Sequence, residues 1–357
     1  MKLDSTIISH KPVPHGGIYS ISNPNPDILD FSSNINPLGP SPRAVKSIKS
    51  NLKILPVYPD PESSDLRKIL QKYTKIHSSQ IVVGNGATEI IYNFCRAFLS
   101  SKTKVLIPIP TFGEYEAAAR LSGAKITFFK TFDLEKDIDN FISKFPHNGC
   151  IFICNPNNPT GHLISKNNLK KIILQAKKNN SLVFVDECFI ELVPQHDESI
   201  LDMIPKNDNL IILRSLTKSF GLAGIRIGYG VSSKKIISIL NKIKIPWNVS
   251  GLAQQAAKES LSTSNYLTKS KKIISQELDF LKTNISKLDK FDCYDSVTNF
   301  ILIKTKLDST VLQKKLLQKK ILIRNCSNIR GLDHNFIRIA VKTRSENQKL
   351  LRALREI

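Results

Sequence analysis

Short apolar runs alternate with helix-like stretches through the first two thirds of the chain. Six runs have the apolar character of buried strands: 81–83, 104–107, 125–129, 150–154, 182–185 and 210–213. Several are separated by stretches with helical periodicity, at 89–99, 111–121 and 165–178. Strands that alternate with helices predict a mostly parallel sheet covered on both faces, and ligands of such sheets lie beyond the carboxyl ends of the strands.

The pattern differs on either side of this region. Residues 1–45 are rich in Pro, Asn, Ser and Gly, but apolar residues spaced through them favour an ordered arm over a disordered tail. Ser63 is expected to cap a helix whose apolar positions are Leu66, Ile69, Leu70 and Tyr73.

A long helical tract begins near residue 232 and is broken at Pro246 and Trp247. After residue 290 come short strands (299–304, 321–324 and 336–341) and two helices, which indicate a smaller α+β domain. We therefore expect an arm at 1–45 that packs with the small domain, a large domain at 46–244, and a linker helix with the small domain at 245–357.

Composition narrows the class of protein. A hydrophobic content of 41% and a charged content of 23% are ordinary for a globular chain. No apolar segment reaches 18 residues, so we expect no membrane span, and the first ten residues lack the apolar core of a secretion signal. The six cysteines have neither Cys-x-x-Cys nor zinc spacing, which predicts no metal site and fits a reducing cytoplasm.

The formal net charge of +22 has two interpretations. It can indicate an anionic partner, either a phosphorylated substrate or a nucleic acid. It can also be a lysine-rich solvated surface, which we favour because the lysines are scattered over predicted helices. No zinc-finger or RNA-binding signature accompanies them, so we expect no nucleic-acid partner.

The chemistry centres on the segment 214–221, which follows the apolar run 210–213. Lys218 can form a Schiff base with an aldehyde cofactor, while Ser215, Thr217 and Arg226 hold the phosphate of that cofactor. The alternative is a surface lysine at the end of a strand.

Polar residues at the ends of other strands support the first interpretation. Gly86, Ala87 and Thr88 open a helix whose free N–H groups form a phosphate seat, and Gly86 lets the backbone approach closely. Phe112 either stacks on a planar cofactor ring or belongs to the core. Asp186 ends an apolar run, where a carboxylate is costly unless it meets a cation such as a protonated pyridine nitrogen; the alternative is a helix cap.

In this order the motifs resemble the pyridoxal-phosphate (PLP) enzymes of fold type I, the aspartate-aminotransferase fold, over nearly the whole chain. The resemblance implies that Lys218 carries the cofactor and that Asp186 pairs with its ring nitrogen. It further implies a set of cofactor contacts: Asn158 near the phenolate oxygen, Phe112 on the ring, and Gly86, Ala87, Thr88, Ser215, Thr217 and Arg226 around the phosphate. Tyr58 matches a tyrosine that reaches the cofactor phosphate of a neighbouring subunit, which implies a homodimer.

Within that fold the chain resembles the L-threonine-O-3-phosphate decarboxylase family of cobalamin biosynthesis, a relative of histidinol-phosphate aminotransferases. The resemblance is carried by 15–17, 30–39, 214–218, 245–247 and 321–328, and by Phe189 where the aminotransferases have tyrosine. It implies decarboxylation of O-phospho-L-threonine to (R)-1-aminopropan-2-yl phosphate, with substrate contacts from His15, Gly16, Asn34, Asn158, Arg324 and Arg338.

Two alternatives stay open. A histidinol-phosphate aminotransferase shares every cofactor residue, and only Phe189 argues against it. A regulator or nucleic-acid binder on a retired enzyme fold would have a fused helix-turn-helix module or lack the lysine, and the sequence has neither feature.

Overall fold

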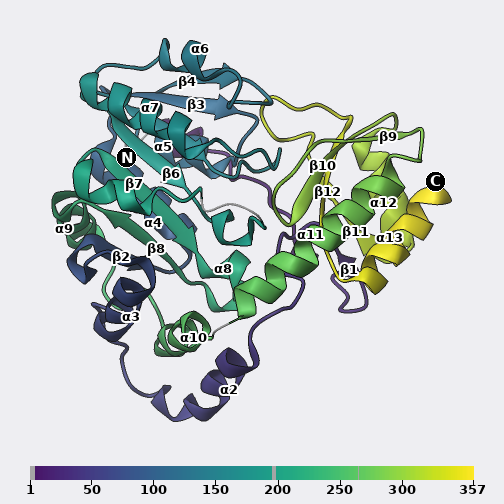
Figure 1. The fold of residues 1–357 in the computed structure, drawn as a ribbon, viewed down its shortest axis with the longest axis horizontal. Coiled ribbons are helices and arrows are strands. Elements are labelled where there is room, and N and C mark those ends of the chain that lie inside the picture. Colours follow the sequence, from purple (N-terminus) through teal and green to yellow (C-terminus); the bar gives the residue numbers. More distant parts are fainter. Residues whose placement is uncertain (1–4, 195–197, 264) are drawn as a thin grey trace.

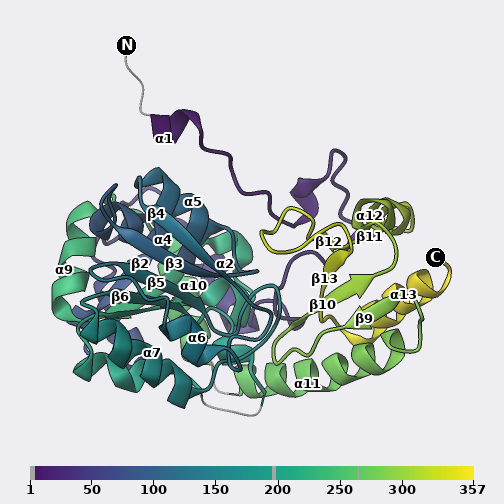
Figure 2. The ribbon, with the colours of Figure 1, turned by 90° about the horizontal axis from the view of Figure 1, so that it is seen from above.

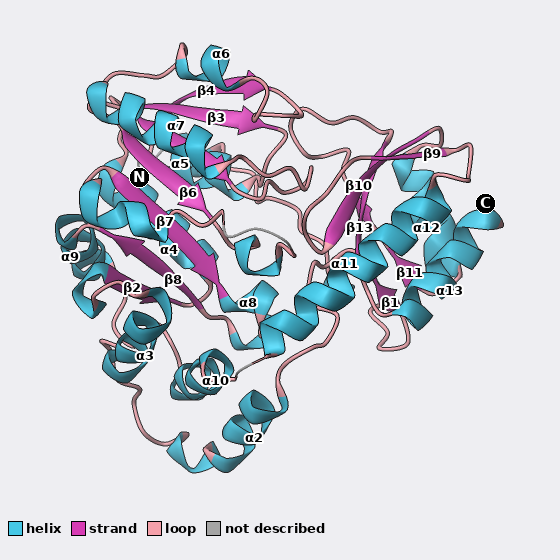
Figure 3. Ribbon diagram, viewed as in Figure 1, coloured by secondary structure: helices cyan, strands magenta, loops and turns pink. Residues whose placement is uncertain are grey.

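A seven-stranded sheet forms the centre of the larger part of the molecule (Figures 1 and 3). The structure is a computed structural model that describes residues 5–194, 198–263 and 265–357. The strands lie in the order β2-β8-β7-β6-β5-β3-β4. Their bounds are β2 Ile81–Gly84, β3 Lys104–Ile109, β4 Lys125–Lys130, β5 Cys150–Cys154, β6 Leu182–Asp186, β7 Leu210–Ser215 and β8 Gly228–Ser232.

The sheet is mostly parallel, as the alternating pattern predicts. Strands β4, β3, β5, β6 and β7 pair in parallel, whereas β8 runs antiparallel to both β7 and β2. The sequence analysis missed β8, because its Gly-Tyr-Gly-Val-Ser sequence has two glycines and little strand propensity. Close packing against α4 (Ala87–Phe98) requires glycine here, because a Cβ on Gly228 would lie 2.6 Å from the backbone nitrogen of Ala87.

Helices cover both faces of this sheet, and each face has its own core. Because side chains alternate along a strand, Leu210 and Ile212 of β7 join one cluster and Ile211 and Leu213 join the other. The first face is covered by α2 Pro42–Ser50, α3 Ser64–Thr74, α6 Ile138–Ile142, α7 Lys166–Lys178 and α10 Gly251–Leu261. The second face is covered by α4 Ala87–Phe98, α5 Glu114–Leu121 and α9 Lys234–Ile243.

The predicted helix after Ser63 is confirmed, but the predicted cap is wrong. Ser63 has a left-handed backbone (φ 47°), and its side chain makes no capping hydrogen bond within the described chain. Asp60 caps the helix instead, since its carboxylate accepts from the backbone N–H of Ser64 at 2.6 Å. The turn that joins the Ser63 N–H to the Asp60 carbonyl brings that carboxylate to the helix end.

The smaller part contains an antiparallel sheet in the order β12-β13-β10-β9. It packs with α11 Tyr266–Ile285, α12 Ser309–Gln318 and α13 Arg344–Arg355 around a third core. The strands are β9 Phe291–Cys293, β10 Phe300–Thr305, β12 Arg324–Asn325 and β13 Phe336–Ala340.

The N-terminal arm begins with α1 Ser5–Ile8 beside α5 and then runs to the smaller part (Figure 2). There β1 Leu29–Asp30 pairs in parallel with β11 Ile321–Leu322. The strand predicted at 321–324 is thus two short strands in different sheets, β11 and β12.

Packing contacts place the boundary between the two parts later in the chain than residue 245. Val249, Ala253 and Ala256 belong to the core of the large sheet, and α10 packs on α2 and α3. We therefore propose a boundary within α11. Among the described residues, no helix has the length and apolarity needed to cross a membrane.

Candidate active site

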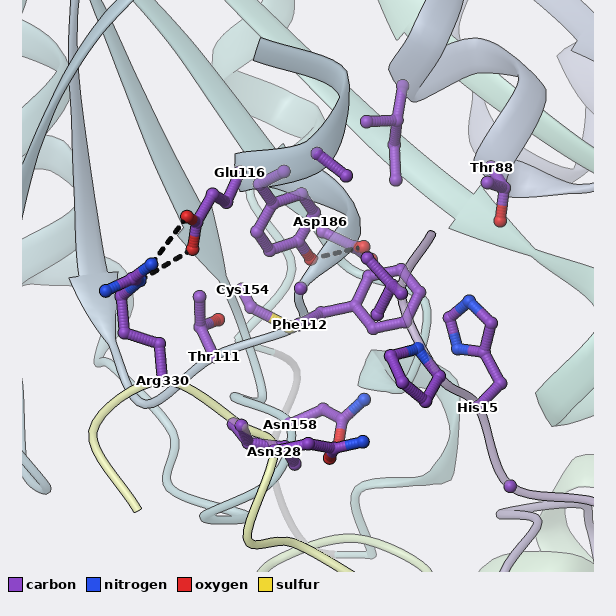
Figure 4. A pocket seen from close by; sticks show the side chains of 18 of the residues that line it. His15, Thr88, Thr111, Phe112, Glu116, Cys154, Asn158, Asp186, Asn328 and Arg330 are labelled. Atoms are coloured by element: carbon purple, nitrogen blue, oxygen red, sulfur yellow. Dashed lines mark hydrogen bonds and ion pairs between the residues drawn. The ribbon is translucent and has the colours of Figure 1, made fainter. Parts of the chain in front are cut away.

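A cavity of about 1210 Å³ opens where the large sheet, the small part and the arm meet (Figure 4). All but two of the residues predicted for the site line it: His15, Gly16, Asn34, Ala87, Thr88, Phe112, Asn158, Asp186, Ser215, Thr217, Lys218, Arg226, Arg324 and Arg338. The carboxyl ends of β6 and β7 bring Asp186 and Ser215 to this edge, as expected for a parallel sheet.

Lys218 lies on the short helix α8 Leu216–Ser219, directly after β7. Burial lowers the pKa of this lysine to about 8, and the cation of Arg338 acts in the same direction. A substantial fraction of its amine is therefore neutral near physiological pH, and the neutral amine is the nucleophilic form.

Asp186 faces the same cavity from the end of β6, and both of its oxygens are held. Tyr115 donates its hydroxyl to Oδ2 at 2.6 Å, and the backbone N–H of Cys188 donates to Oδ1 at 2.8 Å. Burial raises the pKa of this carboxyl, while these hydrogen bonds and the charge of Lys218 oppose the rise. A cation brought into the cavity would favour the ionised form.

The opening turn of α4 lies against Arg226. Gly86 precedes this helix with a φ of 80°, and a Cβ there would collide with the Arg226 guanidinium. Glycine therefore lets a cation lie beside the free N–H groups of the helix start, a combination that suits a phosphate. Gly86 itself does not line the cavity of the described chain.

Two further arginines, Arg324 and Arg338, line the same cavity. Arg338, on β13, is 8% exposed; it donates to the Ser32 carbonyl at 2.8 Å and to Asn158 Oδ1. Its Nε has no hydrogen-bond partner among the described residues, and burial lowers its pKa to about 10. Arg324 donates to the Pro14 carbonyl at 2.6 Å. An anionic ligand is the natural partner for such donors.

A contact between His15 and Glu114 holds the arm against the cavity. Its Nε2 lies 2.6 Å from Glu114 Oε1, and Tyr92 donates to the other oxygen of Glu114 at 2.6 Å. Burial opposes ionisation of Glu114, but these two hydrogen bonds outweigh it and its pKa is lowered. The sequence analysis missed Glu114, because a carboxylate at a helix start is ordinarily a solvated residue that complements the helix dipole.

The sequence did not reveal two other residues that line the cavity, Tyr115 and Arg330. Tyr115 has no neighbour in sequence that points to Asp186, which is 71 positions away. Arg330 binds Glu116 through two hydrogen bonds of 2.7 and 2.8 Å at the edge of the cavity (Figure 4). No sequence pattern marks this contact, because it joins a loop of the small part to α5.

Tyr58 is the second predicted residue that does not line the cavity of the described chain. It is 79% exposed, and its ring centroid lies 4.9 Å from that of Trp247. Within the described chain it does not line the cavity, so any cofactor that it contacts belongs to another copy.

Comparison with known proteins identifies the class. The model of the aminotransferase class I and II family matches residues 26–354, and the chain belongs to this family. Its fold is fold type I of the PLP enzymes, with solved relatives at TM-scores up to 0.85. PLP is the cofactor that this family implies, and the cavity fits it: an amine, a buried carboxylate and a phosphate seat face the same space.

Within the family, the similar proteins include relatives of two kinds. The chain is 37% identical to a protein of Caldanaerobacter subterraneus subsp. tengcongensis described as "Putative threonine-phosphate decarboxylase", over 97% of this chain and 94% of that one. It is 35% identical to the histidinol-phosphate aminotransferase of Methanococcus aeolicus, over 94% and 91% of the two chains.

The solved structures include both kinds. The histidinol-phosphate aminotransferase of Clostridium acetobutylicum is 34% identical with a TM-score of 0.85, covering 92% of this chain and 98% of that one. The L-threonine-O-3-phosphate decarboxylase of Porphyromonas gingivalis is 28% identical with a TM-score of 0.84, covering 92% and 99%.

Proposed function

We propose that this chain is a PLP-dependent decarboxylase of O-phospho-L-threonine that forms (R)-1-aminopropan-2-yl phosphate and CO2 for the aminopropanol arm of cobalamin. The observation that carries the proposal is the pair Arg324 and Arg338, which line the same cavity as Lys218 and Arg226. A cofactor phosphate at Arg226 leaves these two arginines for a substrate with two anionic groups.

The residues around the cofactor have distinct roles in this proposal. Lys218 would hold it through its aldehyde, Asp186 would pair with the ring nitrogen, and Phe112 would cover the ring. Its phosphate would be held by Gly86, Ala87, Thr88, Ser215, Thr217 and Arg226. When bound, the cofactor supplies an electron sink for the pair released as CO2 leaves.

Substrate residues set which bond breaks. His15, Gly16, Asn34, Asn158, Arg324 and Arg338 would bind the two anionic groups of phosphothreonine. Fixing both groups orients the carboxylate relative to the ring, and this orientation selects decarboxylation over proton removal. Lys218 Nζ, with its pKa lowered to about 8, then carries the proton that replaces the carboxylate at Cα.

Phe189 supports the decarboxylase over the aminotransferase. Its ring packs against Phe300 at a centroid distance of 5.1 Å and an interplanar angle of 75°. A phenylalanine has no hydroxyl to donate to the phenolate oxygen, so Asn158 is left to make that contact. Because relatives of both kinds match this chain, a histidinol-phosphate aminotransferase is the second candidate function.

We further propose a homodimer. The exposed apolar side chains around Tyr58 form a patch that one chain leaves open to solvent: Leu52, Leu55, Val57, Tyr58, Ile245 and Trp247. In a dimer through this patch, Tyr58 would reach the cofactor phosphate of the partner. The free cysteines fit a cytoplasmic location.

A product assay separates the two candidates. Purified protein loaded with PLP is incubated with phosphothreonine alone, or with histidinol phosphate and 2-oxoglutarate. The proposal expects CO2 and aminopropanol phosphate in the first reaction and little glutamate in the second. Glutamate without CO2 would establish the aminotransferase instead, and Lys218→Ala provides the inactive control for both reactions.

A further inference from the structure

The hydroxyl of Tyr115 donates a hydrogen bond to Asp186 Oδ2 at 2.6 Å (dashed at Asp186 in Figure 4). Tyr115 is 1% exposed and Asp186 is 5% exposed, so water does not readily replace this bond. The other oxygen accepts from the Cys188 backbone N–H. Without the hydroxyl, Oδ2 would lose this hydrogen bond.

Aromatic packing fixes the Tyr115 ring. It stacks on Phe152 with centroids 5.3 Å apart and an interplanar angle of 18°, and meets Phe112 edge-on at 5.6 Å and 78°. One side chain therefore touches both the proposed partner of the cofactor nitrogen and the residue proposed to cover the cofactor ring. The first turn of α5, which begins at Glu114, carries it.

We propose that Tyr115 is a positioning residue for the cofactor: its hydroxyl keeps Asp186 ionised and aimed at the ring nitrogen, and its ring supports Phe112. This inference rests on the cofactor role of Asp186 in the proposed function, and not on which substrate the enzyme uses.

The physical basis is the cost of a buried carboxylate. Burial raises the pKa of Asp186, and hydrogen bonds to the ionised form oppose that rise. Burial also raises the pKa of Tyr115 well above its ordinary value, so the phenol keeps its proton and stays a donor at neutral pH. A hydrogen bond of this charge-assisted kind corresponds to about a 10- to 100-fold change in cofactor affinity.

The test compares two variants that each lose a single hydroxyl. Tyr115→Phe keeps the ring contacts and removes the bond to Asp186. Tyr73→Phe is the matched control, because Tyr73 also donates to a buried carboxylate, Glu191 at 2.9 Å, away from the cavity lining. For each full-length protein, the PLP dissociation constant and the visible absorbance of bound PLP are measured between pH 6 and pH 10, while circular dichroism checks the fold.

Tyr115→Phe is expected to weaken PLP binding about 10- to 100-fold and to move the pH midpoint of the absorbance change, with Tyr73→Phe unchanged in both. Affinity within twofold of the wild type, or weaker binding with an unmoved pH midpoint, would overturn the proposal, because a packing role alone leaves the titration in place. No substrate enters the measurement, so the result does not depend on the reaction. A wild type that fails to bind PLP would instead overturn the cofactor assignment.

Discussion

Replacing Arg338 with methionine should remove substrate binding without destabilising the fold. Most buried arginines have the opposite effect, because their loss leaves a buried carboxylate unpaired. Arg338 has no carboxylate partner among its hydrogen bonds: it donates to a carbonyl and an amide oxygen, and its Nε is unpartnered within the described chain.

The magnitudes follow from these contacts. The fall of the Arg338 pKa from its ordinary value to about 10 corresponds to roughly 3 kcal/mol for burying the charge, present at every pH below 10 and therefore at pH 7. The lost bonds to Ser32 and Asn158 cost about 1.5 kcal/mol each, so the free energy of unfolding should change by less than about 1.5 kcal/mol. Loss of a two-point contact to a substrate anion should weaken substrate binding by about 100-fold or more.

The assay measures two quantities on PLP-loaded protein. Urea denaturation gives the free energy of unfolding, and the absorbance change of the cofactor on adding phosphothreonine gives the dissociation constant. Arg344→Met is the matched control: Arg344 lies over the ring of Phe280, as Arg338 lies over that of Phe300, but Arg344 pairs with Glu277, which is buried. It should lose stability and keep substrate affinity.

The reasoning about Arg338 is refuted if its methionine variant unfolds more than about 3 kcal/mol more easily, since the charge would then be paired in a way that the contacts do not reveal. It is equally refuted if that variant binds phosphothreonine as tightly as the wild type does.

Three further predictions concern other residues. Arg214→Met should lower the free energy of unfolding by about 3–5 kcal/mol in urea, because Glu187, fully buried, keeps an unpaired charge. Burial raises the pKa of Glu187 in the folded state, so the loss of unfolding free energy in Arg214→Met should shrink as the pH falls through that pKa. An equal loss at pH 5 and pH 8 would contradict this prediction. The rate of PLP uptake by the apoprotein should rise with pH through a midpoint near 8, where the Lys218 amine loses its proton. A midpoint near 10 would contradict the lowered pKa of this amine. Lys218→Ala should show no visible absorbance band from a lysine-bound cofactor. Trp247→Arg should convert the proposed dimer to a monomer in sedimentation velocity, and a dimer that survives would exclude the patch around Tyr58 as its interface.

Local patterns in the sequence predicted the elements of the large sheet well. A run of buried apolar residues must form its backbone hydrogen bonds with neighbours, so the strands at 150–154, 182–185 and 210–213 could be recognised from a few residues each. Polar residues end such runs, and their positions predict that Asp186 and Lys218 lie at one edge of the sheet. The cavity that contains both agrees with that placement; their roles in binding the cofactor remain predictions.

Glycine-rich and long-range features escaped the same reasoning. Strand β8 was missed because its glycines serve the close approach of α4, which no local propensity records. The cap predicted at Ser63 was wrong because the turn from Asp60 to Ser63 brings the Asp60 carboxylate to the end of the helix.

The sequence by itself therefore determined which segments are buried, which kind of sheet they form and which chemical groups stand at its edge, because burial and periodicity are properties of neighbouring residues. Only the tertiary structure decided which groups meet: Tyr115 with Asp186, His15 with Glu114, and Arg338 with Asn158. Those contacts join residues that are 71 to 180 positions apart. They depend on the path of the whole chain, and no short stretch of sequence encodes that path.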